Sequence, residues 1–363
     1  MPLAGFDSRA AWTGAYPDQP NIPLRIEAAA WRARPVYFQL IAPWTRPGRL
    51  EAYQLPTGQR IQQVILLSLL FSLVFGTVLL ARYNHQRGRG DRRGAFRLAA
   101  FVFTISLLAW LFFASHVPTG AEVASFLILG VSPALLSAVS LWVLYLALEP
   151  YVRRRWPDTM ISWSRVLGGS LRDPLVGRDV LIGVLFGTGL MLFSPLQNLV
   201  HFWRGAAPGP EDSLDVWFNV RYLVAHGFLT HLFQGMMIAL LWFFLLFLLR
   251  AVTRKQWLAA GITVLIFTVA SVAGSPDPAI TAPFAFLVST LTVIALLRFG
   301  LVTLATLLFV VELLSSVPLT TNFSAWYASI EIAALLAVLA LAGWAFHTSL
   351  GGRKLFAGNL LDG

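Results

Sequence analysis

Long apolar runs without charge recur along this chain, and each is about long enough to cross a lipid bilayer as a helix. A bilayer core of about 30 Å requires about 20 apolar residues in helical conformation. Nine segments fit: Val64–Arg82, Leu98–Ser115, Val123–Leu148, Val180–Val200, Phe228–Arg250, Leu258–Ala273, Thr281–Leu297, Gly300–Ser316 and Trp326–Phe346. With 57% hydrophobic and 12% charged residues, the chain is too apolar for a soluble domain. We therefore predict an all-α polytopic membrane protein with about nine transmembrane helices.

Two features of these spans bear on their arrangement. The short connection Arg298–Gly300 leaves open whether the seventh and eighth spans form a tight hairpin or one broken unit. Positive charge is also distributed unequally, and Lys and Arg near span ends are retained on the cytoplasmic side. The connections after the odd-numbered spans and the C-terminal tail hold eighteen Lys and Arg, whereas the opposite connections hold only Arg204 and Arg221. We therefore expect the N-terminus outside and the C-terminus in the cytoplasm.

The net charge of +10 is concentrated in these short segments between apolar runs. This distribution favours contact with anionic lipid head groups and excludes nucleic acid as a partner. The chain has no cysteine, which excludes disulfides, iron–sulfur clusters, thiolate zinc sites and cysteine nucleophiles. No cofactor is expected.

The most strongly charged connection is Glu149–Asp179, which we call the basic connection. Asp158 or Thr159 can cap a helix within it, because four apolar residues follow at helical spacing. These four are Met160, Trp163, Leu167 and Leu171. Such a helix is expected to lie in the membrane interface, with its tryptophans at head-group depth and its arginines beside anionic lipid. The alternative is a docking surface for a cytoplasmic domain.

Ten residues of the basic connection are candidates for lipid contact or for coupling to a partner. They are Arg153, Arg154, Arg155, Trp156, Trp163, Arg165, Arg172, Asp173, Arg178 and Asp179. Within this set we expect two local ion pairs, Asp173 with Arg172 and Asp179 with Arg178. Solvated pairs of this kind contribute little to stability.

Residues 1–61 form an extracytoplasmic segment by this orientation. Side chains alternate in Leu24–Ala30 and in Val36–Leu40, which predicts a small β-hairpin. Two strands are marginally stable alone, so the hairpin is expected to need further contacts. The segment has seven arginines and no signal peptide, so we expect a further span upstream in the natural chain. The other parts are a multi-span domain, 62–350, and a cytoplasmic tail, 351–363.

Four stretches carry a resemblance to a known family. They are RPVYFQLIAPWTRP (Arg34–Pro47), GRGDRRGAFRLA (Gly88–Ala99), HVP (His116–Pro118) and Leu146–Gly183, in which the basic connection is the most specific part. Together they resemble the C-terminal membrane region of bacterial receptor-type, eukaryotic-like serine/threonine protein kinases. The resemblance covers most of the chain, with only a general apolar likeness after about Lys255. It implies a multi-pass protein of a bacterial cytoplasmic (inner) membrane, preceded by a kinase domain, a span and a small extracytoplasmic segment.

The catalytic residues of a protein kinase are absent from this chain. A kinase needs a Gly-rich loop, a lysine on its third strand, an HRD-type loop and a DFG metal ligand. The chain has only two lysines, Lys255 and Lys354, and neither HRD nor DFG. It has no protease or hydrolase motif either. We therefore expect a non-catalytic sensor or anchor module, coupled through the basic connection to a kinase domain in cis or in trans; a second copy of the chain is a further candidate partner.

Two carboxylates lie inside predicted spans, Glu312 and Glu331. Charged residues inside a membrane are functional candidates, and two carboxylates in a low dielectric can share a proton. The alternative function is therefore a proton-coupled or small-solute transporter that uses this pair. The structural interpretation is a helix–helix contact near the interface, with three polar residues as partners. These are Thr320, Thr321 and Asn322.

Three histidines near the outer face are candidate metal ligands: His201, His226 and His231. Glu211, Asp212 and Asp215 lie between the first two, and nitrogen and carboxylate ligands together can hold zinc. However, His226 and His231 are five residues apart, which does not place both on one helical face, and there is no HExxH. The sequence therefore does not predict a metal site.

Overall fold

The computed structural model describes residues 7–16, 19–32, 34–45, 57–88, 90–114, 116, 118–204, 223–275, 277–317, 321–322, 324 and 328–352. Its contacts divide the chain into two units, Met1–Pro56 and Thr57–Gly363. Each unit is described by itself below.

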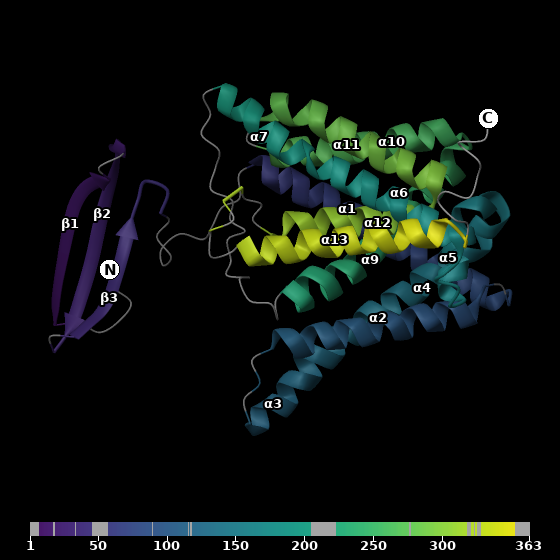
Figure 1. Cartoon of the computed structure of the whole chain (residues 1–363), viewed down its shortest axis with the longest axis horizontal. Helices are drawn as coiled ribbons and strands as arrows, with labels where there is room; N and C mark the ends of the chain where they lie inside the picture. Colours follow the sequence, from purple (N-terminus) through teal and green to yellow (C-terminus); the bar gives the residue numbers. More distant parts are fainter. Residues whose placement is uncertain are drawn as a thin grey trace, which may run out of the picture. The chain divides into compact units, whose positions relative to one another are not determined.

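The first unit contains a three-stranded antiparallel sheet in the order β1-β2-β3 (Figure 1). The strands are β1 (Ser8–Tyr16), β2 (Gln19–Trp31) and β3 (Arg34–Ile41). β2 and β3 form the predicted hairpin, and Arg32 at its turn adopts a positive φ of 48°. β1 was not predicted, because alanines occupy both of its faces and blur the alternation that marks a strand.

The two faces of this sheet differ in polarity. Trp12 of β1, Ile26 of β2 and Leu40 of β3 are aligned across the strands on one face, and Phe38 lies on the same face. The opposite face carries Arg25 and Glu27, which form an ion pair at 2.9 Å. Trp12, Phe38 and Leu40 are exposed, so the apolar face of the sheet is uncovered within this unit.

The second unit is a bundle of helices (Figure 1). The first elements are α1 (Thr57–Gln86), α2 (Arg92–Phe113), α3 (Gly120–Ser125), the π-helix η1 (Phe126–Val131), α4 (Ser132–Arg155) and α5 (Pro157–Leu167). They are followed by α6 (Pro174–Met191), α7 (Phe193–Trp203), the π-helix η2 (Leu223–Thr230) and α9 (His231–Thr253). The last are α10 (Gln256–Gly274), α11 (Pro278–Phe299), α12 (Leu301–Ser315) and α13 (Ala328–Ser349).

The polytopic all-α fold is confirmed, with eight helical segments among the described residues long and apolar enough to cross a membrane. The ninth predicted span, Gly300–Ser316, corresponds to α12, which is shorter at 15 residues. Gly300 breaks the chain between α11 and α12 with φ of 97°, so these are two separate helices. α12 is central: Leu301, Leu304 and Leu313 are fully buried, and α12 packs mainly against α6 and α9.

Three glycines let α6 lie close to α12 and α13. A Cβ atom on Gly177 would lie 2.6 Å from the Ser349 backbone nitrogen of α13. On Gly183 it would lie 2.6 Å from the Cβ of Thr306, and on Gly187 it would lie 2.8 Å from a backbone oxygen of α12. Small residues allow such close backbone approach between membrane helices. The contacts of Gly183 and Gly187 show that α6 runs parallel to α12, and that of Gly177 places the start of α6 beside the end of α13.

Candidate functional site

Exposed arginines gather at one end of the bundle, which we call the basic end. It carries Arg153 and Arg154 of α4, Arg172 in the α5–α6 connection and Arg178 of α6. The side chain of Arg155 lies outside the described residues. α5 lies at this end (Figure 1). The structure thus brings most residues of the basic connection together around α5.

α5 turns its apolar face toward other helices and not toward lipid. Trp163 is 3% exposed and Trp156 is 9% exposed. Trp156 stacks on Phe243 of α9 with ring centroids 5.7 Å apart, and the guanidinium of Arg250 lies 4.3 Å from the centroid of the Trp156 ring. Both tryptophans therefore contact other helices and not lipid, and their depth in the membrane stays a prediction. Burying large aromatic side chains between α4, α6 and α12, which α5 contacts, is the more favourable arrangement.

The predicted helix of the basic connection exists, but it begins differently. α5 starts at Pro157 with Trp156 at the N-cap position, so Asp158 and Thr159 lie inside the helix and neither is the expected N-cap residue. The hydroxyl of Thr159 donates instead to the carbonyl oxygen of Trp156 at 2.8 Å. A Cβ on Gly300 would lie 2.7 Å from the Thr159 carbonyl oxygen, so the start of α5 sits against the break between α11 and α12.

One ion pair and one helix cap fix the connection between α5 and α6. Arg165 of α5 pairs with Asp173. Asp173 also accepts a hydrogen bond from the backbone N–H of Leu175 at 2.9 Å and so caps the N-terminus of α6. We expected Arg172 as the partner of Asp173, and this was wrong: folding of α5 brings the more distant Arg165 to the carboxylate.

Asp179 joins three helices. It pairs with Arg178 at 2.8 Å, as expected, but its side chain is 4% exposed and so it is not a solvated surface group. The hydroxyl of Ser162 in α5 donates to the Asp179 carboxylate, and the hydroxyl of Thr303 in α12 donates to the Asp179 backbone oxygen at 2.9 Å. A buried carboxylate is tolerated only when it is paired and hydrogen-bonded, as here.

Glu149 joins α4 to α2 in a similar way. It is 5% exposed, accepts a hydrogen bond from the backbone N–H of Asp91 at 3.2 Å and pairs with Arg153 at 3.2 Å. Asp91 in turn caps α2, accepting from the Gly94 N–H at 2.9 Å. The two helices are therefore held in register at the basic end.

Asn84 of α1 forms hydrogen bonds to α4 close to Pro150, a proline inside that helix. Pro150 lies inside α4 and has no N–H for the carbonyl four residues earlier, that of Leu146. The side-chain nitrogen of Asn84, which is 1% exposed, donates to this carbonyl at 3.0 Å and to that of Ala147 at 3.2 Å. Asn84 thus supplies the hydrogen bond that Pro150 cannot donate. An unpaired carbonyl inside a membrane-spanning bundle would be costly.

Sequence reasoning missed several members of this network. They are Asn84, Asp91, Glu149, Ser162 and Thr303. One signal was available, since an internal proline such as Pro150 requires a donor for the freed carbonyl. The donor itself, 62 residues away in sequence, could not be identified without the packing of α1 on α4.

The ion pair of Asp173 predicts a pH dependence. Desolvation would raise the pKa of Asp173, but hydrogen bonds from Arg165 and from the Leu175 N–H outweigh it and lower the pKa. A carboxyl group with a lowered folded-state pKa stabilises the fold above its unfolded pKa, about 4, and stops doing so as pH falls through the lowered value. We expect Asp173→Asn, which keeps a capping oxygen, to be less stable than wild type at pH 7, with a difference that shrinks below about pH 4.

Thermal melting of the detergent-solubilised proteins between pH 7 and pH 3 measures the difference in stability between wild type and Asp173→Asn. Arg165→Gln is the companion variant, because it removes the largest favourable partner of Asp173 while leaving the cap in place. The Arg165→Gln exchange should also reduce the part of the folding stability that depends on ionisation of Asp173. A difference between wild type and Asp173→Asn that stays constant over this pH range would contradict the assignment.

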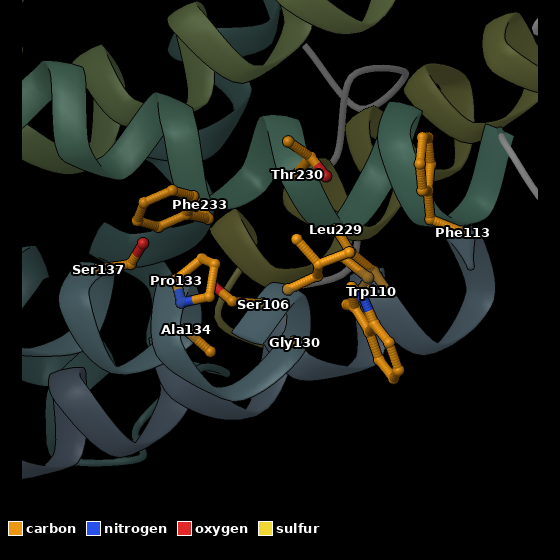
Figure 2. Close-up of a pocket in the computed structure, with 12 residues that line it drawn as sticks. Ser106, Trp110, Phe113, Gly130, Pro133, Ala134, Ser137, Leu229, Thr230 and Phe233 are labelled. Atoms are coloured by element: carbon orange, nitrogen blue, oxygen red, sulfur yellow. The ribbon is translucent and has the colours of Figure 1, made fainter. Parts of the chain in front are cut away.

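A hollow of about 240 Å³ lies among α2, the η1–α4 segment and the η2–α9 segment (Figure 2). Its lining is mostly apolar and aromatic, with Trp110 from α2, Pro133 from α4 and Phe233 from α9. Both π-helices contribute, η1 through Gly130 and η2 through Leu229. π-Helical turns are frequent at functional sites. The lining suits an apolar molecule or chain.

The α2–α3 connection beside this hollow is held by His116. Its Nδ1 lies 2.6 Å from a carboxylate oxygen of Glu122, and its Nε2 lies 2.8 Å from the carbonyl oxygen of Leu111. The imidazole also meets the Trp110 ring edge to face at 5.5 Å. A residue from the short HVP stretch therefore fixes one wall of the hollow.

Glu312 and Glu331 lie at the end of the bundle opposite the basic end. Glu312 is in the last turn of α12, and Glu331 is in the first turn of α13. Glu331 is 5% exposed and Glu312 is half-buried. Of the expected polar partners, Thr320 lies outside the described residues, and the side chain of Asn322 accepts from the Ser324 N–H at 3.1 Å.

The candidate histidines do not form a cluster in the described residues. His201 Nδ1 lies 3.9 Å from a carboxylate oxygen of Asp277, and His231 Nδ1 lies 3.1 Å from the Gln234 side-chain oxygen. The side chain of His226 and the acidic residues Glu211, Asp212 and Asp215 lie outside the described residues. Within the part that is described, no three His, Asp or Glu residues are placed to hold a metal ion.

Comparisons with protein-family models, with curated proteins and with solved structures find no match for this chain. The relation of the basic connection to receptor-type kinases therefore stays a prediction from the sequence.

Proposed function

We propose that this chain is a non-catalytic membrane sensor or anchor module, related to the membrane region of receptor-type serine/threonine kinases. In this proposal it lies in a bacterial inner membrane with its N-terminus outside and its basic end in the cytoplasm. The basic connection, Glu149–Asp179, couples the bundle to a cytoplasmic kinase domain in the same chain or in another. The unequal distribution of Lys and Arg supports this orientation.

One structural observation carries the coupling argument: α2 and α4 contribute to both the hollow and the network at the basic end. α2 lines the hollow with Trp110 and meets Glu149 through Asp91. α4 lines the hollow with Pro133 and carries Glu149 itself. A molecule that alters the packing of α2 on α4 in the hollow therefore acts on the same helix pair that positions α5.

The surface of the basic end also suits a docked protein domain. Ile161 of α5 is 39% exposed and Leu171 is 51% exposed, although both lie beside charged residues. Arg153, which lines a cavity together with Ile161, is 73% exposed in its side chain. Exposed apolar side chains rimmed by cations are typical of protein interaction sites.

Site-specific photo-crosslinking from the full chain in its native membrane tests this proposal. A photoreactive residue at Ile161 or Leu171 is expected to capture a polypeptide that carries a kinase domain, identified by peptide mass spectrometry. The control position is Leu185, which is 65% exposed on the membrane-spanning part of α6 and should not capture it. Crosslinks to lipid alone from Ile161 and Leu171 would contradict a coupling surface.

The alternative is a proton-coupled or small-solute transporter that uses Glu312 and Glu331. It is supported by the burial of Glu331 in a helix that is long and apolar enough to span a membrane. Proton uptake by proteoliposomes containing wild type, compared with the Glu312→Gln/Glu331→Gln variant, separates the two proposals. Uptake that depends on both carboxylates would favour the transporter.

A further inference from the structure

A cavity of about 460 Å³ opens at the basic end, between the α5–α6 connection and the end of α13. It is lined by Arg172, Trp344, His347, Thr348, Gly351 and Gly352. None of these residues except Arg172 was singled out by the sequence. The cavity is separate from the hollow near Trp110 and from the network around Glu149.

The charges around this cavity favour an anion. No carboxylate is among the described residues that line it. Arg165 and Arg178, which flank Arg172 in sequence, are each paired with an aspartate. Arg172 has no ion pair and no hydrogen bond from its side chain within the described part of the chain, and it is exposed. Its guanidinium group is therefore available to an anion in the cavity, and guanidinium binds phosphate oxygens in a bidentate manner.

The position of the cavity along the helices fits a head group. α13 is long and apolar enough to cross a membrane, and the cavity lies beside its last turn. Trp344 is 39% exposed and lies one turn before His347 on the same face of α13. The indole therefore lies on the hydrocarbon side of the cavity, with the imidazole and guanidinium groups toward water, the arrangement typical of an interfacial tryptophan.

Two glycines keep the floor of the cavity open. Gly351 and Gly352 both have positive φ, 59° and 83°, which a residue with a side chain rarely adopts. A Cβ on Gly351 would lie 2.9 Å from the ring of Pro174 at the start of α6. The turn after α13 therefore passes close to α6 without a side chain that would fill the cavity.

We propose that this cavity binds the phosphate group of an anionic membrane phospholipid. Arg172 and His347 donate to the phosphate oxygens, and Trp344 packs along the glycerol and the first part of an acyl chain. The site does not depend on coupling to a kinase domain. Free inorganic phosphate shares the same chemistry, so the test has to separate the two sources.

Thermal melting of the full-length, delipidated protein in neutral detergent provides the test, with three added probes: phosphatidylglycerol, phosphatidylcholine and inorganic phosphate. Phosphatidylglycerol is expected to raise the melting temperature of wild type in a saturable manner. The Arg172→Gln/His347→Gln variant should need about tenfold more of this lipid for half of the effect. Both exchanged side chains are exposed, so melting without lipid should match wild type and show that the variant is folded.

Arg154→Gln is the matched control, because Arg154 is also an exposed arginine of the basic end but does not line the cavity. It should respond to phosphatidylglycerol as wild type does, and Arg172→Lys should recover part of the response lost in Arg172→Gln. An equal loss in Arg154→Gln would show general attraction between charges and overturn the site. Saturation by inorganic phosphate at the same concentration, or by phosphatidylcholine, would overturn the anionic lipid as its ligand.

Discussion

Exchange of Gly183 for alanine is expected to destabilise the helix bundle by about 1–3 kcal/mol, the usual cost of forcing an extra group into a packed interior. The new Cβ atom would lie 2.6 Å from the Thr306 Cβ and 2.7 Å from the Thr303 backbone oxygen. α12 cannot move away freely, because it also packs against α9 and its residues Leu304 and Leu313 are fully buried. The intrinsic helix preference of alanine, about 1 kcal/mol over glycine, acts in the opposite direction.

The same helix offers a matched control in Gly189. A Cβ at this position meets nothing within 4 Å, so Gly189→Ala should be neutral or slightly stabilising. Unfolding in mixed micelles by titration with sodium dodecyl sulfate gives the free energy of unfolding for each variant. The double variant Gly183→Ala/Gly187→Ala should be the least stable of the series, because both contacts are with α12. Equal stability of the Gly183 and Gly189 variants would show that α6 and α12 are not in close contact.

Exchange of Asn84 for leucine should cost about 1–3 kcal/mol, because the carbonyl of Leu146 is left buried without a donor. Leucine has the same branched arrangement of side-chain heavy atoms and is not smaller than asparagine, so the loss is not caused by a cavity. The structure predicts a specific rescue: Pro150→Ala restores the N–H that can donate to the same carbonyl. In the Pro150→Ala background, Asn84→Leu should therefore cost much less than in wild type.

A double-mutant cycle of these two changes measures the coupling. The four proteins are wild type, each single variant and the double variant, all unfolded in mixed micelles. A positive coupling energy would show that Asn84 substitutes for the missing proline N–H. If Asn84→Leu is equally costly in both backgrounds, the side chain of Asn84 stabilises the bundle by packing alone.

Particular residues show where sequence reasoning succeeded. Apolar runs predicted the helical spans because a bilayer demands length and continuous hydrophobicity, and both are local properties of the chain. The alternation in Leu24–Ala30 and Val36–Leu40 predicted the β2–β3 hairpin for the same reason. The pair of Arg178 and Asp179 was found because its members are adjacent in sequence.

The failures at the basic end share a different cause. The pattern of Met160 and Trp163 indicated an apolar helix face but not whether lipid or protein covers it, since both are apolar surroundings. The arginine partner of Asp173 and the burial of Trp156 depended on how α5 packs across several helices.

The sequence by itself determined that this is a multi-span helical protein, which segments form its helices and where its positive charge lies. Those properties follow from the solvent preference and the period of neighbouring residues. Only the tertiary structure decided which carbonyl accepts from Asn84, which helices Asp179 joins and that Arg172, which has no ion pair among the described residues, lies beside a cavity. Such contacts join residues up to 124 positions apart, and their energies depend on geometry that no local pattern encodes.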